Sequence, residues 1–118
     1  MGVFRQRVTV TNPATREATQ VECLVDTGST YLWFPEDLLQ ALGVQPALRR
    51  RLRLATGQVI ERSAAEVLVT LNGETLTVVC VFGDAGSDPL LGSLALEAFS
   101  LGVDPVNKRL VPTISYLA

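Results

Sequence analysis

Apolar and polar residues alternate along most of the chain, a pattern typical of β-strands with one buried face. The alternation predicts strands over residues 4–11 and 18–25, followed by an apolar run at 31–34. Strand-like arms at 48–55 and 58–60 meet at Thr56-Gly57. A longer strand continues to Asn72-Gly73, a strong hairpin signal, and residues 75–82 return from it.

Two short helices are expected between these strands. Pro35 followed by acidic residues predicts a helix start, and Gly43 ends that helix. A loop over residues 83–89 leads to a second helix, expected from about Ser93 to Leu101 and ended by Gly102. Residues 103–107 then predict a turn, and residues 110–111 begin a last strand. The expected fold class is therefore all-β with two short helices, in a single domain over residues 1–118.

The composition is typical of a folded chain, and the net charge limits the kinds of partner that we expect. Apolar residues make up 47% of the chain, charged residues 19%, and the net charge is −2, so neither nucleic acid nor a membrane is an expected partner. Arg49, Arg51 and Arg53 alternate with other residues, which places them on one face of a strand. We interpret them as a solvated face that discourages edge pairing, in preference to a nucleic-acid site. The start of the chain lacks a signal-peptide pattern, so we expect a cytoplasmic location.

The residue types that are missing restrict the possible chemistry. The chain has no histidine, which excludes Ser-His and Cys-His nucleophilic catalysis and the usual zinc sites. Its one lysine, Lys108, lies in a polar turn, and Cys23 and Cys80 lie in apolar runs where they are expected to be small buried hydrophobic residues rather than a disulfide. Carboxylates remain as the groups for acid–base work, and we expect neither a metal nor an organic cofactor.

One carboxylate has a distinctive setting. Asp26, Thr27 and Gly28 directly follow the apolar end of a strand and precede the hydroxyl residues Ser29 and Thr30. The strand anchors the carboxylate, and Gly28 permits a tight backbone with inward-pointing amides. An Asx-type turn between two strands suits the same residues, so this stretch alone leaves a catalytic loop and a simple turn both open.

The wider pattern resembles the aspartic proteases of the pepsin and retropepsin kind. Asp26-Thr27-Gly28 resembles their catalytic loop, and Leu90-Leu91-Gly92 followed by a helix resembles the second half of their signature. The Thr56-Gly57 hairpin stands where that family carries its flap. The resemblance runs from about Val8 to Pro112 and includes a likeness of residues 90–112 to short microbial retropepsin-like proteins. It implies a retropepsin-like closed β-barrel that is homodimeric.

The resemblance also implies roles for these residues. Asp26 of two subunits would form the catalytic dyad, because a single Asp-Thr-Gly supplies half of it, and Thr27 would hydrogen-bond across the two-fold axis. Gly28 and the Thr56-Gly57 flap would contact the substrate. Retroviral members usually have alanine and aspartate at Ser29 and Thr30, and arginine at Ser93, so the details of the dimer interface depart from theirs. We hypothesise that the Ser29 hydroxyl donates to Asp26 and favours its ionised form.

The favoured function is that of an aspartic endopeptidase that hydrolyses peptide bonds with an activated water. Because few charges lie near the motifs, we expect an apolar cleft that takes extended peptides with bulky apolar residues. The alternative is a catalytically silent dimer of the same fold that acts as a peptide-binding or structural module. A third interpretation, a β-rich module with a coincidental motif, leaves the Leu90-Leu91-Gly92 motif unexplained.

Overall fold

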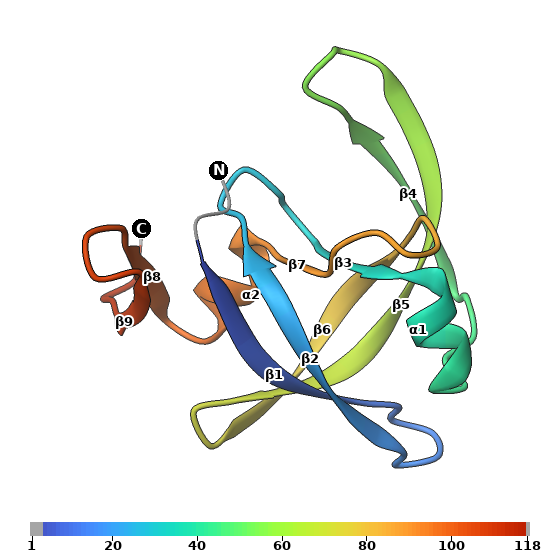
Figure 1. Ribbon diagram of the computed structural model, residues 1–118, viewed down its shortest axis with the longest axis horizontal. Helices are drawn as coiled ribbons and strands as arrows, with labels where there is room; N and C mark the ends of the chain where they lie inside the picture. Colours follow the sequence, from blue (N-terminus) through green and yellow to red (C-terminus); the bar gives the residue numbers. More distant parts are fainter. Residues whose placement is uncertain (1–3, 118) are drawn as a thin grey trace.

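The computed structural model describes residues 4–117 as a curved sheet with short helices at its margins (Figure 1). In chain order the elements are β1 (Arg5–Thr11), β2 (Ala18–Val25), β3 (Leu32–Pro35), α1 (Glu36–Ala41), β4 (Leu48–Arg53), β5 (Val59–Leu71), β6 (Glu74–Gly83), β7 (Leu90–Leu91), α2 (Ser93–Ala98), β8 (Leu101–Asp104) and β9 (Arg109–Pro112). Among the described residues, no helix is long and apolar enough to cross a membrane.

The main sheet closes on itself. Its seven strands follow the order β1-β2-β7-β3-β6-β5-β4, and a further pairing of β1 with β5 joins the two sides. The register of that closure brings Val10 opposite Val69. Within residues 4–117, β4 lies beyond the closure and pairs only with β5, so it is an edge strand. The mostly β fold and the closed barrel expected from the sequence are therefore confirmed.

Because apolar and polar residues alternate along these strands, every second side chain points into the barrel. Val8 and Val10 on β1 and Val67 and Val69 on β5 are buried, while their neighbours are partly or fully exposed. Both cysteines belong to this core as free thiols, as expected. Burial raises the pKa of the Cys23 thiol to about 12 and also raises the pKa of Cys80, so both are neutral apolar packing groups near neutral pH.

The first helix begins where the sequence predicts. Pro35 is its N-cap residue, and Gly43 follows it in the left-handed conformation (φ 78°), where glycine has no steric penalty. The buried Asn12 ties the β1–β2 turn to this helix end, since its side-chain amide donates to the carbonyl of Leu42 at 3.1 Å and its Oδ1 accepts the amide of Ala14.

The second helix is shorter than predicted, and this prediction is wrong at its C-terminal end. α2 ends at Ala98 instead of about Leu101, and Leu101–Asp104 form strand β8 against β9. Phe99 is buried as the helix ends, and Ser100 takes a left-handed conformation (φ 54°) that turns the chain away. Once the chain has turned, Leu101 and Val103 alternate on a strand, so the apolar spacing that suggested one more helical turn belongs to β8.

Candidate active site

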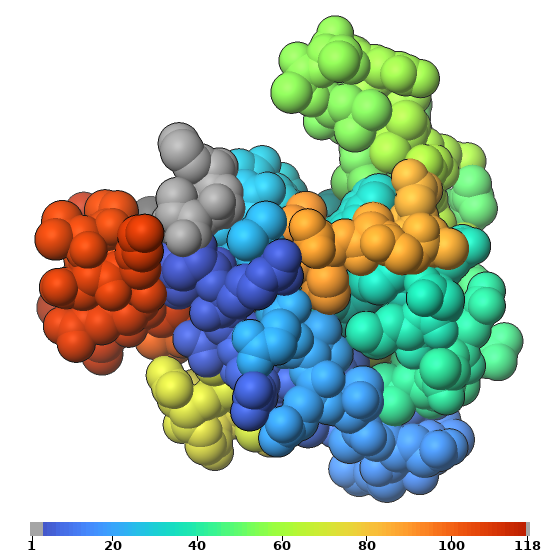
Figure 2. All heavy atoms as spheres, viewed as in Figure 1, coloured from blue at the N-terminus to red at the C-terminus, as the bar shows by residue number. Residues whose placement is uncertain are grey.

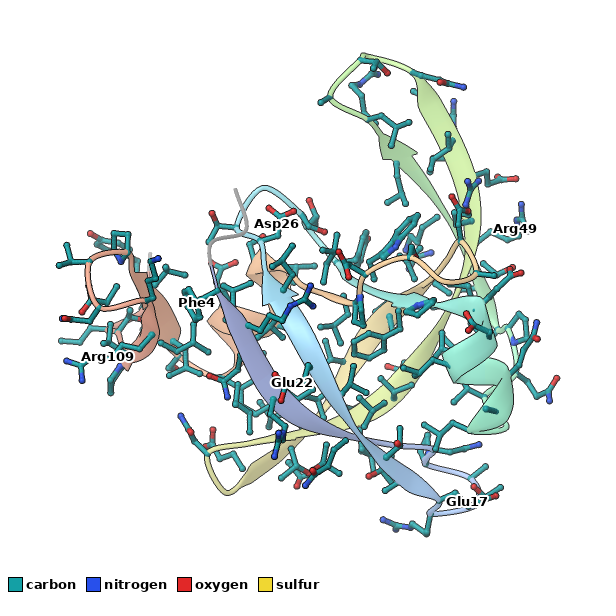
Figure 3. All side chains as sticks on the ribbon, viewed as in Figure 1. Phe4, Glu17, Glu22, Asp26, Arg49 and Arg109 are labelled. Atoms are coloured by element: carbon teal, nitrogen blue, oxygen red, sulfur yellow. The ribbon has the colours of Figure 1, made fainter. Side chains whose placement is uncertain are left out.

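Asp26 stands directly at the end of β2, on the loop that leads to β3 (Figure 3). Its backbone amide donates to the carbonyl of Leu91 at 3.1 Å, and its carbonyl accepts the amide of Ser29 at 3.1 Å. The Gly28 amide donates to its Oδ1 at 3.0 Å. The carboxylate is half-buried, while Thr27 and Gly28 are exposed. The loop therefore holds one oxygen of the carboxylate through a backbone donor, at the end of a strand whose last residue, Val25, is buried.

The two motifs found in the sequence meet in space. β2 and β7 are parallel neighbours, with Leu24 opposite Leu90 and Val25 opposite Leu91. Beyond β7, the amide of Ser93 donates to the carbonyl of Ser29 at 2.7 Å, and the amide of Leu94 donates to the carbonyl of Thr30 at 3.0 Å. The start of α2 thus holds the far side of the Asp26 loop, and the loop is fixed on both sides by residues more than sixty positions away in the sequence.

Gly92 is required by this contact. A Cβ atom at this position would lie 2.4 Å from the carbonyl oxygen of Tyr31 and 2.6 Å from that of Ser29. Both neighbours are backbone atoms of the active-site loop, so they cannot move aside as a flexible side chain would. The backbone of Gly92 itself is extended (φ −90°, ψ 179°), which shows that the need for glycine is one of space and not of conformation.

The expected contact of Ser29 is corrected by the structure. Its hydroxyl donates to the backbone carbonyl of Tyr31 at 2.9 Å, not to Asp26. A serine hydroxyl has one proton to donate, so the hypothesis that this proton supports the ionised carboxylate is wrong for this conformation. Ser29 instead stabilises the turn that connects Asp26 to β3.

The expected flap is a projecting hairpin made by β4 and the first half of β5. It stands clear of the barrel in Figures 1 and 2. At its tip the amide of Gly57 donates to the carbonyl of Leu54 at 2.8 Å, and the amide of Leu54 donates to the carbonyl of Gln58 at 2.8 Å. Gly57 has φ 90°, which suits a three-residue hairpin loop closed by a left-handed residue. Thr56 and Gly57 therefore form the tip of an exposed hairpin, as the sequence predicts.

A cleft of about 440 Å³ separates the Asp26 loop from this hairpin. Apolar and aromatic side chains supply much of its wall, among them Trp33, Leu52 and Leu90. Arg51 and Arg53 of the hairpin also line it, so the prediction of an apolar cleft is wrong at this wall. Those arginines are distant from either motif in the sequence, and the curvature of the hairpin brings them to the cleft.

Trp33 lines the cleft, although no pattern in the sequence singled it out. Its indole Nε1 donates to the Ser87 hydroxyl at 3.0 Å, and that hydroxyl donates in turn to the carbonyl of Asp84. Gly83 leaves room for the ring, because a Cβ there would lie 2.3 Å from Nε1. The loop over residues 83–89, expected only as a connection, therefore positions an aromatic wall of the cleft. A signal for this role is absent from the local pattern, since it depends on the pairing of β3 with β6.

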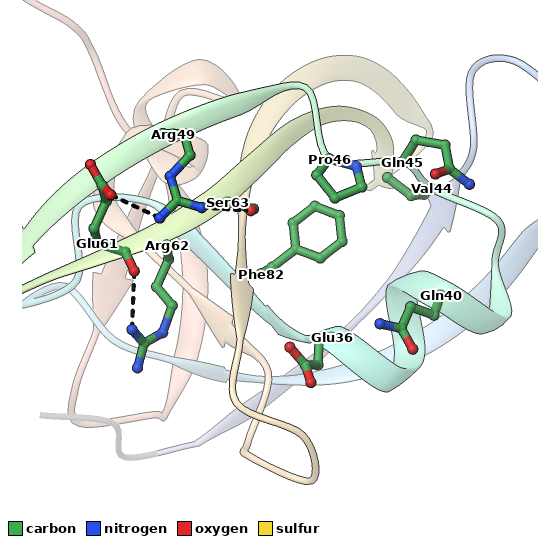
Figure 4. Close-up of a pocket in the computed structure, with 10 residues that line it drawn as sticks. All are labelled: Glu36, Gln40, Val44, Gln45, Pro46, Arg49, Glu61, Arg62, Ser63 and Phe82. Carbon is green, nitrogen blue, oxygen red and sulfur yellow. Dashed lines mark hydrogen bonds and ion pairs between the residues drawn. The ribbon is translucent and has the colours of Figure 1, made fainter.

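A second cavity, of about 380 Å³, lies between α1 and the base of the hairpin (Figure 4). Phe82 and Pro46 line it, beside the ion pair of Arg49 with Glu61 at 2.8 Å. It contains no residue of the Asp26 loop or of the Leu90-Leu91-Gly92 motif. The cleft beside the Asp26 loop is therefore the candidate active site.

Comparisons with known proteins agree with this geometry. A family model described as aspartyl protease matches residues 8–95. The fold is similar to that of the EIAV protease in complex with the inhibitor HBY-793, with a TM-score of 0.58 and 17% identity over 80% of this chain and 86% of the other. It is also similar to the simian foamy virus (mac) protease in solution, with a TM-score of 0.53 and 14% identity over 80% of this chain and 94% of the other. A search of curated proteins found no match.

Proposed function

The chain belongs to the aspartyl protease family, and from this premise we propose that it is an aspartic endopeptidase whose active site combines Asp26 from two copies of the chain. The observation that carries the proposal is the seating of the Asp26 loop on Leu90-Leu91-Gly92, beside a cleft whose opposite wall is the hairpin. The fold alone would not require a carboxylate on the loop that borders the cleft.

Peptide hydrolysis by water needs both a base and an acid. One carboxylate takes a proton from the attacking water while its partner donates a proton to the scissile carbonyl, and the two share a proton because like charges so close cannot both ionise cheaply. The chain has no histidine, and no carboxylate is among the described residues that line the cleft, which begin at Gly28, two positions after Asp26. A second Asp26, related by a two-fold axis, supplies the missing group. In that arrangement Thr27, exposed at the loop tip, would hydrogen-bond across the axis.

Exposed apolar residues support self-association. Ile114, Tyr116 and Leu117 follow β9 and are 95%, 103% and 99% exposed. Large apolar side chains gathered on a short segment mark a surface that another molecule covers. We infer that this segment contributes to the contact between the two copies.

The substrate we propose is an extended peptide or protein segment lying in the cleft. The hairpin tip at Thr56 and Gly57 would close over it, with Gly28 offering backbone contacts from below. Mostly apolar walls suit bulky apolar side chains at the cut site. The cytoplasmic location expected from the sequence stays a prediction.

The test is cleavage of a peptide library by the purified protein at several acidic to neutral pH values, beside Asp26→Asn. We expect cleavage by the native protein and at least about a thousandfold loss in the variant, since a positioned acid–base group contributes up to about 10⁴-fold and here two are lost at once. Persistent cleavage by Asp26→Asn would refute the role of Asp26. Binding of library peptides by both proteins without cleavage would favour the silent peptide-binding module.

A further inference from the structure

Basic residues are concentrated on the hairpin that forms one wall of the cleft. The chain as a whole has 10 basic and 12 acidic residues and a net charge of −2, yet half of its basic residues lie between positions 48 and 63, beside a single acidic residue there, Glu61. These residues are Arg49, Arg50, Arg51, Arg53 and Arg62. A charge excess this local, opposite in sign to the chain's net charge, creates a positive potential along one wall of the cleft.

The charge is not neutralised evenly. Arg49 pairs with Glu61 at 2.8 Å, and Arg62 pairs with Asp84 at 3.1 Å. Arg51 and Arg53 form no ion pair within residues 4–117, and Arg53 donates to the carbonyl of Gly57 at 3.0 Å. Both arginines that line the cleft thus keep a charge that is available to a ligand, whereas Arg50, which also forms no ion pair within residues 4–117, lines a different cavity.

Their position suits contact with an extended chain. Both line the cleft with the residues that run from Gly28 to Trp33, and no carboxylate side chain is among its described lining residues. Arg51 and Arg53 are two positions apart on an edge strand, so their side chains leave the same face about 7 Å apart. That spacing equals the spacing of alternate side chains on an extended peptide lying alongside.

We propose that Arg51 and Arg53 determine substrate specificity by selecting peptides with an acidic residue near the apolar residues at the cut site. This inference rests on the proposed endopeptidase function. Apolar side chains of the peptide pack on Trp33, Leu52 and Leu90, and a Glu or Asp carboxylate on the side facing β4 accepts hydrogen bonds from a guanidinium. In a two-fold dimer the second hairpin repeats the pair, so acidic residues are selected on both sides of the scissile bond.

A peptide fits these walls better than a nucleic acid does. Leu52, Leu54, Val81 and Leu90 line the same cleft, and a sugar–phosphate backbone would desolvate its charges against them. The remaining arginines of the hairpin are already paired or lie on other cavities, which leaves no continuous track for a run of phosphates.

The experiment compares kcat/KM for peptide pairs that share one apolar cut site and differ only by Glu or Gln at positions flanking it. The native protein is expected to cleave the Glu peptide about fivefold faster per contacting arginine, the upper end for a solvent-accessible ion pair, with the ratio falling toward one in high salt. Arg51→Gln is expected to lower the ratio, and Arg51→Glu to favour a Lys peptide instead. Arg50→Gln is the matched control, because it removes the same charge from the same strand but lines a different cavity.

Each outcome bears on a separate claim. Equal cleavage of the Glu and Gln peptides by the native protein would overturn the inference and leave the endopeptidase function standing. Cleavage of neither peptide, nor of any library peptide, would overturn the proposed function and this inference with it. Binding of a single-stranded oligonucleotide that is lost in Arg51→Gln, with a peptide ratio of one, would show that the arginines serve nucleic acid and would also overturn it.

Discussion

Replacing Gly92 with alanine tests the contact that joins the two motifs. The added methyl group would lie 2.4 Å and 2.6 Å from two backbone oxygens of the Asp26 loop, and 2.9 Å from the carbonyl carbon of Tyr31. Carbon and oxygen atoms cannot approach so closely, so the loop and β7 must separate. Separation lengthens the hydrogen bonds from Ser93 to Ser29 and from Leu94 to Thr30, which are 2.7 Å and 3.0 Å.

The size of the effect follows from these contacts. Forcing a methyl group into a packed site costs about 1–3 kcal/mol, and each weakened hydrogen bond adds up to about 1 kcal/mol. We expect the free energy of unfolding to fall by about 2–4 kcal/mol, which for a chain of this length lowers Tm by roughly 8–16 °C. Because the loop carries Asp26, peptide cleavage should fall further than the folded fraction does.

Urea unfolding followed by circular dichroism, at one fixed protein concentration, measures this change. Gly73→Ala is the matched control, because Gly73 has φ 79° and open space around its Cβ position. Gly73→Ala should lower the free energy of unfolding by about 1–2 kcal/mol, because alanine is disfavoured in the left-handed conformation, and it should leave cleavage unchanged. If Gly92→Ala were as stable and as active as the native protein, the contact between the two motifs would not hold the loop as described.

Three further predictions follow from other contacts. Burial raises the pKa of Cys23 to about 12 and also raises the pKa of Cys80. The stability that the neutral thiols contribute is therefore complete below pH ~8.5 and is lost as the pH rises above it, at up to about 1.4 kcal/mol per pH unit for each thiol. Urea unfolding between pH 8 and 10 measures this slope, and a flat profile would contradict the burial of the thiols. Ser29→Ala should lower the free energy of unfolding by about 1 kcal/mol, because the Tyr31 carbonyl loses its donor; an unchanged urea midpoint would count against that bond. Replacing Ile114, Tyr116 and Leu117 together with serine should raise the dimer dissociation constant by at least about tenfold, since each buried apolar side chain contributes roughly 1.5–3 kcal/mol; sedimentation measures it, and an unaltered constant would place the dimer contact elsewhere.

The local pattern of apolar and polar residues predicted the strands and the position of the Asp26 loop. Alternation of apolar residues specifies which face of β1 and β5 is buried, and Pro35 and Gly43 mark the limits of α1. These are local signals, each decided by a few neighbouring residues. The resemblance of two short motifs was enough to place Asp26 near Leu90-Leu91-Gly92, and the parallel pairing of β2 with β7 confirms that placement.

Features that depend on distant contacts were missed. The end of α2 was misplaced because Leu101 and Val103 fit both a helix face and a strand, and only the pairing of β8 with β9 distinguishes them. The cleft arginines and the role of Trp33 follow from how the hairpin curves and how β3 pairs with β6. The Ser29 hydroxyl was expected to donate to Asp26, but the path of the loop brings it to the carbonyl of Tyr31 instead.

The central claim, that two Asp26 carboxylates form one active site, is tested most directly by mixing native protein with Asp26→Asn. After subunit exchange at equal amounts, random pairing leaves about one quarter of the dimers with two native chains. Cleavage activity is predicted to fall to about one quarter of that of an all-native sample at the same total protein concentration, because mixed dimers lack half of the dyad. Activity at about one half would contradict it, since each chain would then act with its own Asp26 alone.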